Sequence, residues 1–479
     1  MTGPAVRQDY TLSLVTETPL HVGGAAGDPV VDLPLATDGQ GRLMVPGTSW
    51  AGVLRAFARR THDAAEVDAL FGAAPRNADA ATEADPGHAS RLFVSDTTIG
   101  ETGLEMRTGV GIDRRQGAAA TRILYDRMVV PAGTTLTLNL RYEGPSRDAA
   151  AGLVAQVRAV GLTVGGASRR GLGRLRCTAA QVREIDLTRG ASLLAALANR
   201  TAATEVKAAD GAAAELPRIE VRWSPVRPVV VGSAAPGEQA DLVPLLTRTP
   251  DGRLVPVLPG STVKGVLRAL AERVVRTIHD LGPPPPDFVT ALDGIAREVP
   301  VFGVLFGSRE QAGALSVPDV TAVTTEPVAP DLWLGYLAGT AKQVTSWTRE
   351  RTHVALDRWS GGAAEHRLFT VQETQDLGWA PLRLELDPDR LDRATPEQRR
   401  GAVVLLGVAV ALLAEGHAGF GHATTRGLGE VAVRGVDVVG VDRWELPAHD
   451  GGPGLWDWLQ EASGHAYLTD VVTRGEEKT

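Results

Sequence analysis

A series of four short motifs occurs twice in this chain, in the same order. Each series begins with a Pro-Gly segment, continues through Leu-Phe-Gly and an apolar-Asp-Arg triplet, and ends with Arg-Gly-Leu-Gly. The first series occupies 45–55, 70–72, 112–114 and 170–173, and the second occupies 258–268, 305–307, 356–358 and 426–429. The spacing between matching motifs grows from 213 to 256 residues, so the second copy has longer loops. A repeat of this length is typical of a duplicated module.

We therefore predict two domains, a first module at 1–190 and a second at 217–479 with larger insertions, joined by an Ala-rich linker at 191–216. Each copy follows the order strand, helix, strands, helix, glycine loop, strand. This order is typical of a ferredoxin-like (RRM-like) α+β module, in which helices cover one face of an antiparallel sheet. Further expectations are an N-cap at Thr48 or Ser49 of the first Pro-Gly helix and a strand at 332–337.

Composition limits the class of protein. The net charge of −8 disfavours a protein that coats nucleic acid, yet 91–176 holds thirteen Arg against seven acidic residues, and RNA binding needs only a local positive surface. Cys177 is the only cysteine, so no internal disulfide or cysteine-based zinc site is possible. The longest apolar run, 402–414, is too short to span a bilayer. We expect a cytoplasmic protein with no membrane partner.

The glycine-rich segments at 165–173 and 419–429 are candidate phosphate-binding loops. Glycine lets a backbone approach a ligand closely, and successive free amides can hold phosphate oxygens. Neither segment has the Gly-Lys-Ser/Thr ending of a nucleotide P-loop. The alternative is a tight turn between helix and strand, although its recurrence in both copies favours a functional role.

The two Pro-Gly helix starts are candidate anion sites, because a free helix N-terminus presents unpaired amides and the positive end of the dipole. Lys264, in the first turn of the second helix, is placed to reach a phosphate. The alternative is a simple N-cap. The loops that precede these helices carry Asp32 and Asp241, which as isolated carboxylates would otherwise be solvated side chains. No clustered His or Glu spacing indicates zinc.

Taken together, these motifs resemble the RAMP superfamily, the RNA-binding proteins of CRISPR systems, and are most similar to the Cas-seven backbone subunit of type III effector complexes. The resemblance rests on 20–24, 45–49 and 165–173, and on 258–265 and 419–429 in the second copy, and a doubled chain resembles the fused subunits of type III-D-like complexes. It implies CRISPR RNA, target RNA and other type III subunits as partners. It also implies a β-hairpin thumb in each module, at 109–128 and 352–374, that displaces bases at regular intervals.

The resemblance further implies a metal-dependent endoribonuclease that uses Mg²⁺ or another divalent ion. In members that cut target RNA, an Asp before the Pro-Gly helix lies beside the displaced base. Asp32 matches this position within Val31-Asp32-Leu33-Pro34-Leu35, and Asp241 matches it with one extra residue before Pro244. Two departures are Ala51, where the family usually has Lys, and the lack of a His matching His21 in the second copy.

These comparisons predict a set of RNA-contacting residues: His21, Gly23, Gly24, Gly47, Thr48, Ser49, Arg55, Arg114, Gly165, Gly166, Arg169, Arg170, Gly171, Gly260, Ser261, Lys264, Arg268, Arg358, Thr425, Arg426 and Gly427. Three other functions stay open: a non-catalytic backbone subunit, an endonuclease that processes CRISPR RNA, and a protein scaffold that binds no RNA. The processing enzyme would need a His or Lys general base near a cleft.

Overall fold

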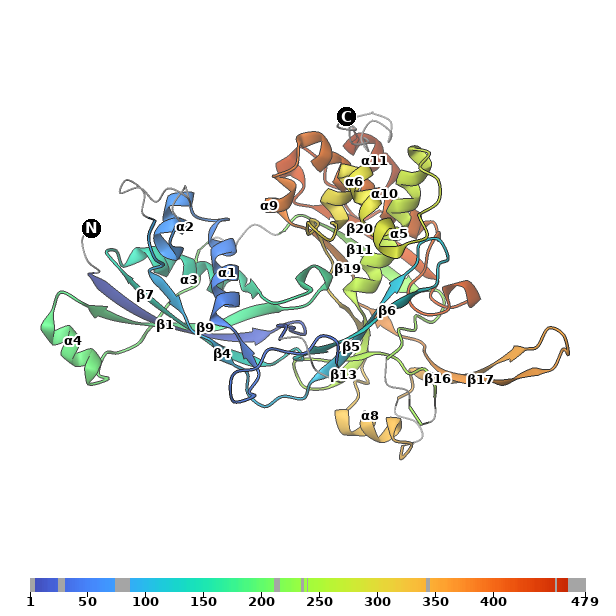
Figure 1. Cartoon of the computed structure of the whole chain (residues 1–479), viewed down its shortest axis with the longest axis horizontal. Helices are drawn as coiled ribbons and strands as arrows, with labels where there is room; N and C mark the ends of the chain where they lie inside the picture. The colour runs from blue at the N-terminus through green and yellow to red at the C-terminus, as the bar shows by residue number, and fades with distance from the viewer. Residues whose placement is uncertain are drawn as a thin grey trace. The chain divides into compact units, whose positions relative to one another are not determined.

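A computed structural model describes residues 5–24, 31–73, 87–210, 216–233, 237–238, 240–341, 345–452 and 455–463. The chain forms two compact units (Figure 1). Unit 1 comprises 1–105, 128–168 and 172–214, and unit 2 comprises 106–127, 169–171 and 215–479. Two short segments of the first repeat, 106–127 and 169–171, therefore belong to unit 2.

Unit 1 contains a ferredoxin-like βαββαβ core. The core elements are β1 (Val6–Thr16), α1 (Gly47–Ala58), β3 (Leu92–Val94), β7 (Thr135–Gly144), α3 (Asp148–Val160) and β9 (Arg174–Asp186). The antiparallel sheet has the order β10-β9-β1-β7-β3, so the four core strands run in the ferredoxin-like order 4-1-3-2. Smaller elements are β2 (Met44–Val45), α2 (Ala64–Phe71), β4 (Thr97–Thr98), β8 (Leu162–Thr163), α4 (Gly190–Leu197) and β10 (Thr204–Glu205).

Alternation along β1 decides which face of this sheet is covered. Tyr10, Leu12 and Leu14 are buried, while the residues between them are less buried or exposed. The buried face packs against α1 through Trp50 and Leu54, in one hydrophobic cluster that also includes α3 residues. A period of two places one face on the core and leaves the other open, as the sequence predicts.

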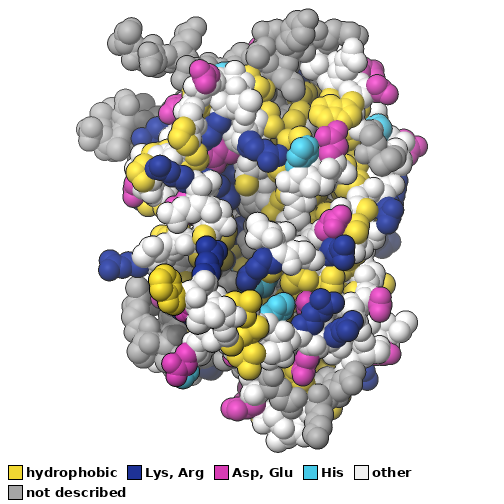
Figure 2. All heavy atoms as spheres, turned by 90° about the vertical axis from the view of Figure 1, so that its right-hand side faces the viewer, with side chains coloured by type: hydrophobic (Ala, Val, Ile, Leu, Met, Phe, Trp, Pro, Cys, Tyr) yellow, Lys and Arg dark blue, Asp and Glu magenta, His cyan; other side chains and the backbone are white. Residues whose placement is uncertain are grey.

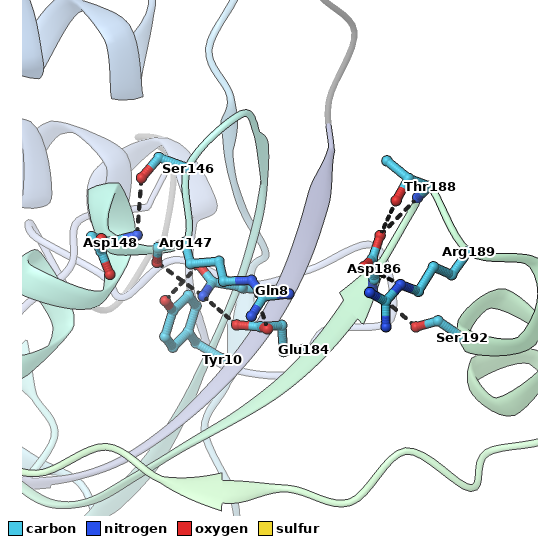
Figure 3. A network of polar contacts seen from close by, with 10 residues as sticks. All are labelled: Gln8, Tyr10, Ser146, Arg147, Asp148, Glu184, Asp186, Thr188, Arg189 and Ser192. Carbon is cyan, nitrogen blue, oxygen red and sulfur yellow. Dashed lines mark hydrogen bonds and ion pairs between the residues drawn. The ribbon is translucent and has the colours of Figure 1, made fainter.

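A polar network lies beside the core on β1 and β9 (Figure 3). The Gln8 amide donates to the Arg147 carbonyl at 3.0 Å and to Glu184 at 3.2 Å, and it accepts from the Tyr10 hydroxyl at 2.9 Å. Burial raises the pKa of Tyr10, with a further contribution from Glu184. These hydrogen bonds compensate for burying Gln8 and fix the position where α3 begins.

The segment expected to be a linker is largely folded onto unit 1. It contains most of α4, and β10 pairs with β9 in register Thr204↔Val182. At the end of β9, Asp186 accepts from Thr188 and pairs with Arg189, while the Asp186 amide donates to Ser192 in α4 (Figure 3). The helix is thereby tied to the strand before it.

Unit 2 repeats the core topology. Its core elements are β11 (Arg218–Pro225), α5 (Gly260–Ile278), β14 (Leu315–Ser316), β19 (Leu382–Leu386), α10 (Pro396–Ala414) and β20 (Val431–Val439). The sheet order β14-β19-β11-β20 is again ferredoxin-like. Even the irregularities recur, because the β-bulge between Ser13 and Leu14 has a counterpart between Arg222 and Trp223. The chain thus consists of two tandem modules of one α+β fold.

Unit 2 has further elements. Three of them, α7 (Pro300–Phe306), β13 (Leu254–Leu258) and β15 (Val320–Val323), are the counterparts of α2, β2 and β4. The others are α6 (Phe288–Glu298), α8 (Pro330–Leu337), α9 (Pro388–Leu391), α11 (Trp456–Ala462), β12 (Leu246–Arg248) and β18 (Gly378–Trp379). The expectation of a strand at 332–337 is wrong: the segment is α8, which starts with Pro330 at its first turn and buries Trp333 and Tyr336. The apolar run at 402–414 lies within α10 and is buried almost throughout, as expected.

Two β-hairpins complete unit 2. The first is β5 (Glu105–Ile112) with β6 (Ala119–Val129), and the second is β16 (Thr348–Leu356) with β17 (Ala363–Thr374). They coincide with the segments predicted as hairpin thumbs. The β16–β17 hairpin extends from unit 2 as a two-stranded arm (Figure 1).

Candidate nucleic-acid interface

Asp32 lies on the loop between β1 and α1, next to the base of the first hairpin. The carbonyl of Leu33 accepts from the Met128 amide at 3.1 Å, and Ala36 donates to Val22 at 2.8 Å. A bridge between Gly23 and Leu35 closes the loop. The Asp32 side chain is exposed. The loop backbone is therefore held at the residues that follow this carboxylate.

Asp241 occupies the same place in the second module. The Leu242 carbonyl accepts from the Gln372 amide at 2.9 Å, Leu245 donates to Val231 at 2.7 Å, and Gly232 bridges to Pro244. Every one of these loop residues lies 209 positions after its counterpart. The extra residue inferred from the sequence is therefore not needed, because Val243 stands where the first copy has Pro34.

The Asp241 carboxylate is exposed but has a fixed orientation. Its Oδ2 accepts from the Thr370 amide at 2.7 Å, and its own amide donates to the Thr370 carbonyl at 2.9 Å. Thr370 lies on β17, so the carboxylate is held at the base of the second hairpin. A fixed carboxylate beside an arm is suited to act on a strand that crosses the arm.

The glycine loops are built alike in the two modules. The Gly166 amide donates to the His21 carbonyl at 2.7 Å, and the His422 amide donates to the Val230 carbonyl at 2.6 Å. The next anchor is Gly173 to the Pro19 carbonyl, matched by Gly429 to Pro228, both at 2.8 Å. These amides are used within the chain, so the expectation of a cradle of free amides is wrong for Gly166.

Glycine is required here by the fold itself. Gly165 has φ +89°, and a Cβ on it would lie 2.2 Å from the His21 carbonyl oxygen. Gly421 has the same φ, and a Cβ on it would lie 2.3 Å from the Val230 oxygen. These glycines allow close contact with the chain's own backbone and not with a ligand. The structure therefore supports the alternative that each segment is a tight turn between helix and strand.

Each module places one histidine ring beside its glycine turn, and the sequence predicted only His21. His21 is buried and bonds the Met128 carbonyl through Nδ1 at 2.9 Å, so Nδ1 carries the proton. Its other ring nitrogen lies toward Gly23 and Gly166. In the second module the position of His21 is Val230, but His422 takes the position of Gly166. Aligning the glycine loops by their offset of 256 would have revealed this exchange.

His422 is neutral in this setting. Arg426, which can only donate, lies 3.3 Å from Nε2, so that nitrogen is the acceptor. Burial lowers the pKa of His422, and the positive charge of Arg426 and the neighbouring His353 lower it further. His353 stacks on Phe369 with ring centroids 5.2 Å apart.

The helix starts are not open anion sites. The Gly47 amide donates to Asp96 Oδ1 at 2.7 Å, and the Gly260 amide donates to Asp319 Oδ1 at 2.9 Å. Neither helix has a side-chain cap from Thr48, Ser49 or Ser261, so the expected N-caps are wrong. The chain's own carboxylates occupy the position proposed for phosphate, although Thr48 and Ser261 are exposed.

Three predicted RNA-binding cations instead hold the protein together. Arg55 donates to the Gly72 carbonyl at 3.2 Å and Arg268 to the Gly307 carbonyl at 3.4 Å, so each fixes the Leu-Phe-Gly turn of its module. Lys264 is partly buried and donates to the Leu315 carbonyl at 2.6 Å. Burial lowers the pKa of Lys264 to about 7, and nearby arginines lower it further.

Three residues of the first repeat that belong to unit 2 are less exposed than their counterparts in the second repeat. Arg114 pairs with Glu272 at 3.7 Å, Arg169 pairs with Asp387, and Gly171 is buried. Arg170 donates to the Tyr125 hydroxyl at 2.8 Å but is exposed, as its counterpart Arg426 is. The counterparts in the second repeat are all exposed: Arg358, Thr425, Arg426 and Gly427.

Both repeats have exposed residues of the predicted site. They are Gly23, Asp32, Thr48, Gly165, Gly166 and Arg170 in the first repeat, and Asp241, Ser261, Arg358, Thr425, Arg426 and Gly427 in the second. Figure 2 looks onto the side from which β16–β17 extends, and Lys and Arg side chains are spread over this face among hydrophobic ones. A surface of this kind can contact phosphates through its cations and bases through its apolar groups.

Comparison with protein families agrees with this geometry. The model of the RAMP superfamily matches residues 13–176 and 226–432, one match in each module, and together they cover more than half of the chain. The chain belongs to the RAMP superfamily. A comparison with curated proteins finds no match. The membership indicates an RNA-binding role associated with CRISPR systems, and the two matched regions contain the two ferredoxin-like cores of this RAMP protein.

The described residues of this RAMP protein contain neither a ready-made metal site nor a membrane span. Nowhere in this part of the chain do three or more His, Cys, Asp or Glu side chains gather as metal ligands. Among the described residues, Asp32 and Asp241 are therefore not part of such a group, whereas a Ca²⁺ or Mg²⁺ site usually has several oxygen ligands. None of the described helices is long and apolar enough to cross a membrane.

Proposed function

We propose that this protein is a CRISPR RNA-binding backbone subunit of a type III effector complex, and that it cuts complementary target RNA through Asp32 and Asp241. The observation that carries the proposal is the equivalence of the two aspartates. Both are exposed, both lie at the base of a β-hairpin, and both are held by matching backbone hydrogen bonds. Two unrelated solvated carboxylates would not share this environment.

The geometry supports a division of roles. The hairpin arms and exposed cations bind the guide–target duplex, and a displaced base bends the backbone so that the 2′-oxygen can align with the scissile bond. The carboxylate then acts on that nucleotide, and His21 or His422 lies on the adjacent glycine turn. Because the described residues form no metal cage, we derive no step through a divalent ion.

The test uses the assembled complex with labelled complementary RNA in Mg²⁺ and in EDTA. We expect cuts in wild type and none in the double variant Asp32→Asn, Asp241→Asn, with unchanged RNA binding. Loss of cutting in EDTA would show that a metal bound together with the RNA takes part. If the double variant cuts normally, the assignment of the site is wrong.

The same samples address the alternatives. Intact target RNA with the wild-type complex favours a purely structural backbone subunit. Cutting of CRISPR repeat RNA without a target favours a processing endonuclease. A complex that purifies without RNA and shows no salt-dependent RNA binding favours a protein scaffold.

A further inference from the structure

The second repeat contains a helical insertion that the first repeat lacks. Residues 99–104 connect β4 to β5 and contain no helix, whereas residues 324–347 connect β15 to β16 and contain α8. Because β15 is the counterpart of β4, the insertion enters unit 2 immediately before the β16–β17 arm. It is therefore a feature of the second module alone, and it precedes the arm at whose base Asp241 is held (Figure 1).

The insertion packs on the loop that carries Asp241. Among the described residues, one hydrophobic cluster has six buried members, four from the insertion and two from this loop: Val328, Trp333, Tyr336, Trp347, Ala240 and Val243. The two loop residues lie on either side of Asp241 and are 2% and 1% exposed. Trp333 and Tyr336 of α8 stack in this cluster with ring centroids 5.4 Å apart. The buried side of α8 thus covers the chain on both sides of the carboxylate.

A backbone hydrogen bond ties the start of the loop to the same helix. The Glu238 amide donates to the carbonyl of Leu337, the last residue of α8, at 2.9 Å. A Cβ on Gly339, two residues beyond α8, would lie 3.3 Å from the Glu238 Cβ. The chain that leads to Asp241 is therefore in close contact with α8 through its backbone as well as through its apolar side chains.

Tyr336 also ties α8 to the arm. Its hydroxyl donates to Glu350 Oε1 of β16 at 3.1 Å, although the residue is fully buried. Burial raises the pKa of Tyr336, and the bond to Glu350 raises it further, so the hydroxyl stays protonated as the donor. Glu350 lies opposite Gln372 in the arm, and the Gln372 amide donates to the Leu242 carbonyl at 2.9 Å. Tyr336 therefore contacts both of the structures that hold Asp241, which are the loop and the arm.

The matching loop of the first module shows what the insertion adds. Both loops are hydrogen-bonded to the base of a hairpin. Pro34, however, is only partly buried, whereas its counterpart Val243 is fully buried in the cluster with α8. The bond to the hairpin base is thus common to the two modules, and the cover by α8 belongs to the second.

We propose that Tyr336 is a positioning residue for Asp241, and that α8 holds the Asp241 loop against the base of the arm. The proposal rests on the proposed function, since it takes Asp241 as the residue that acts on the target RNA. Because Tyr336 is fully buried, it acts through the loop and not on the RNA. A displacement of about 1 Å in a catalytic group can cost about 100-fold in rate, so loss of this support should slow the cut at Asp241.

Hydrogen exchange of the full chain tests the positioning without RNA. The Thr370 amide donates to the Asp241 carboxylate at 2.7 Å, so its exchange rate reports whether that bond persists. Tyr336→Ala should raise this rate about tenfold or more, while the amides of β11 and β19 keep their protection. Leu334→Ala, at a position of α8 that is 61% exposed, should change neither. An unchanged rate at Thr370 in Tyr336→Ala would overturn the proposal.

Val243→Ala tests the same contact from the side of the loop, and it decides the question if Tyr336→Ala disturbs the fold of unit 2. It should raise the exchange rate of the Thr370 amide in the same direction, by about threefold, with β11 and β19 unchanged. An unchanged rate in this variant would also count against the proposal, because the cavity lies directly beside the loop.

The two cuts in one labelled target RNA give the second readout, in the assembled complex. Tyr336→Ala should lower the single-turnover rate constant of the Asp241-dependent cut about tenfold or more at an unchanged half-saturating RNA concentration, with the Asp32-dependent cut as the internal control. Tyr336→Phe keeps the ring and should restore the rate to within about fivefold. Equal slowing of both cuts, or a change in half-saturation alone, would contradict the positioning role. If wild type makes no cut, the proposed function fails, and exchange at Thr370 still decides the role of Tyr336.

Discussion

The first and second repeats of this chain have nearly the same turns but opposite surroundings. The tip of β5–β6 and residues 169–171 are seated in unit 2, whereas the tip of β16–β17 and the loop at 424–427 are exposed. Since the local structures match, the surroundings and not the motif decide whether an Arg holds the protein together or is available to a partner. This contrast can be tested by substituting equivalent residues of the two modules, or a buried residue and an exposed residue of the same type.

The largest difference is expected between the carboxylates at the two helix starts. Asp319 accepts from the Gly260 amide and lies 3.9 Å from the largely buried side chain of Arg107, while the exposed Asp96 accepts from the Gly47 amide. Asp319→Ala should cost about 3–5 kcal/mol because it removes a partner of a buried charge. Asp96→Ala should cost about 1 kcal/mol, as for a lost cap. Native-state hydrogen exchange of α5 and α1 measures both, and equal costs would contradict the comparison.

A smaller difference is expected between Gly171→Ala and Gly427→Ala. Both positions have φ near +90°, so both variants lose about 1 kcal/mol from backbone strain. Only at residue 171 would the new Cβ meet the Asp319 nitrogen, which should add about 1–3 kcal/mol. Chemical denaturation of the two variants gives the comparison. If Gly427→Ala were the more destabilising, the exposed position of that loop would be wrong.

The smallest effect concerns pH and Lys264. Burial lowers its pKa to about 7, so between pH 7 and 10 the unfolded chain binds a proton that the folded chain does not. The free energy of unfolding therefore rises with pH in this window, by up to about 2 kcal/mol from pH 7 to pH 9. Lys264→Met should remove this rise, and the exposed Lys207→Met should keep it. Denaturation at the two pH values decides, and an unchanged slope in Lys264→Met would refute the assignment.

Much of the fold followed from the sequence, because the repeat and the alternating patterns reflect the core directly. The duplicated βαββαβ order, both hairpins and the buried helix at 402–414 were predicted. The strand expected at 332–337 is wrong because α8 is short and its sequence fits both periods. Leu332, Leu334 and Tyr336 alternate as in a strand, while the buried Trp333 and Tyr336 have the spacing of a helix. Contacts with insertions cannot be read from a local pattern.

The candidate site was predicted less completely. The equivalence of Asp32 and Asp241 was visible in the sequence. The use of the Gly166 and Gly47 amides by the chain itself was not, since it depends on residues that are distant in sequence, such as Asp96. His422 was missed because it lies on the glycine loop, at the position of Gly166. His21 lies on the other segment of the turn, where the second module has Val230. Arg114 and Arg358 occupy the same position in the repeated apolar-Asp-Arg triplet, so the motif alone does not distinguish them.

The central claim is that the two modules carry equivalent sites, and mapping the cut ends of one labelled target RNA tests it most directly. We predict that Asp32→Asn removes one cut and Asp241→Asn removes a different one, each leaving the other cut unchanged. Loss of both cuts in either single variant, or survival of both cuts in the double variant, would contradict the account.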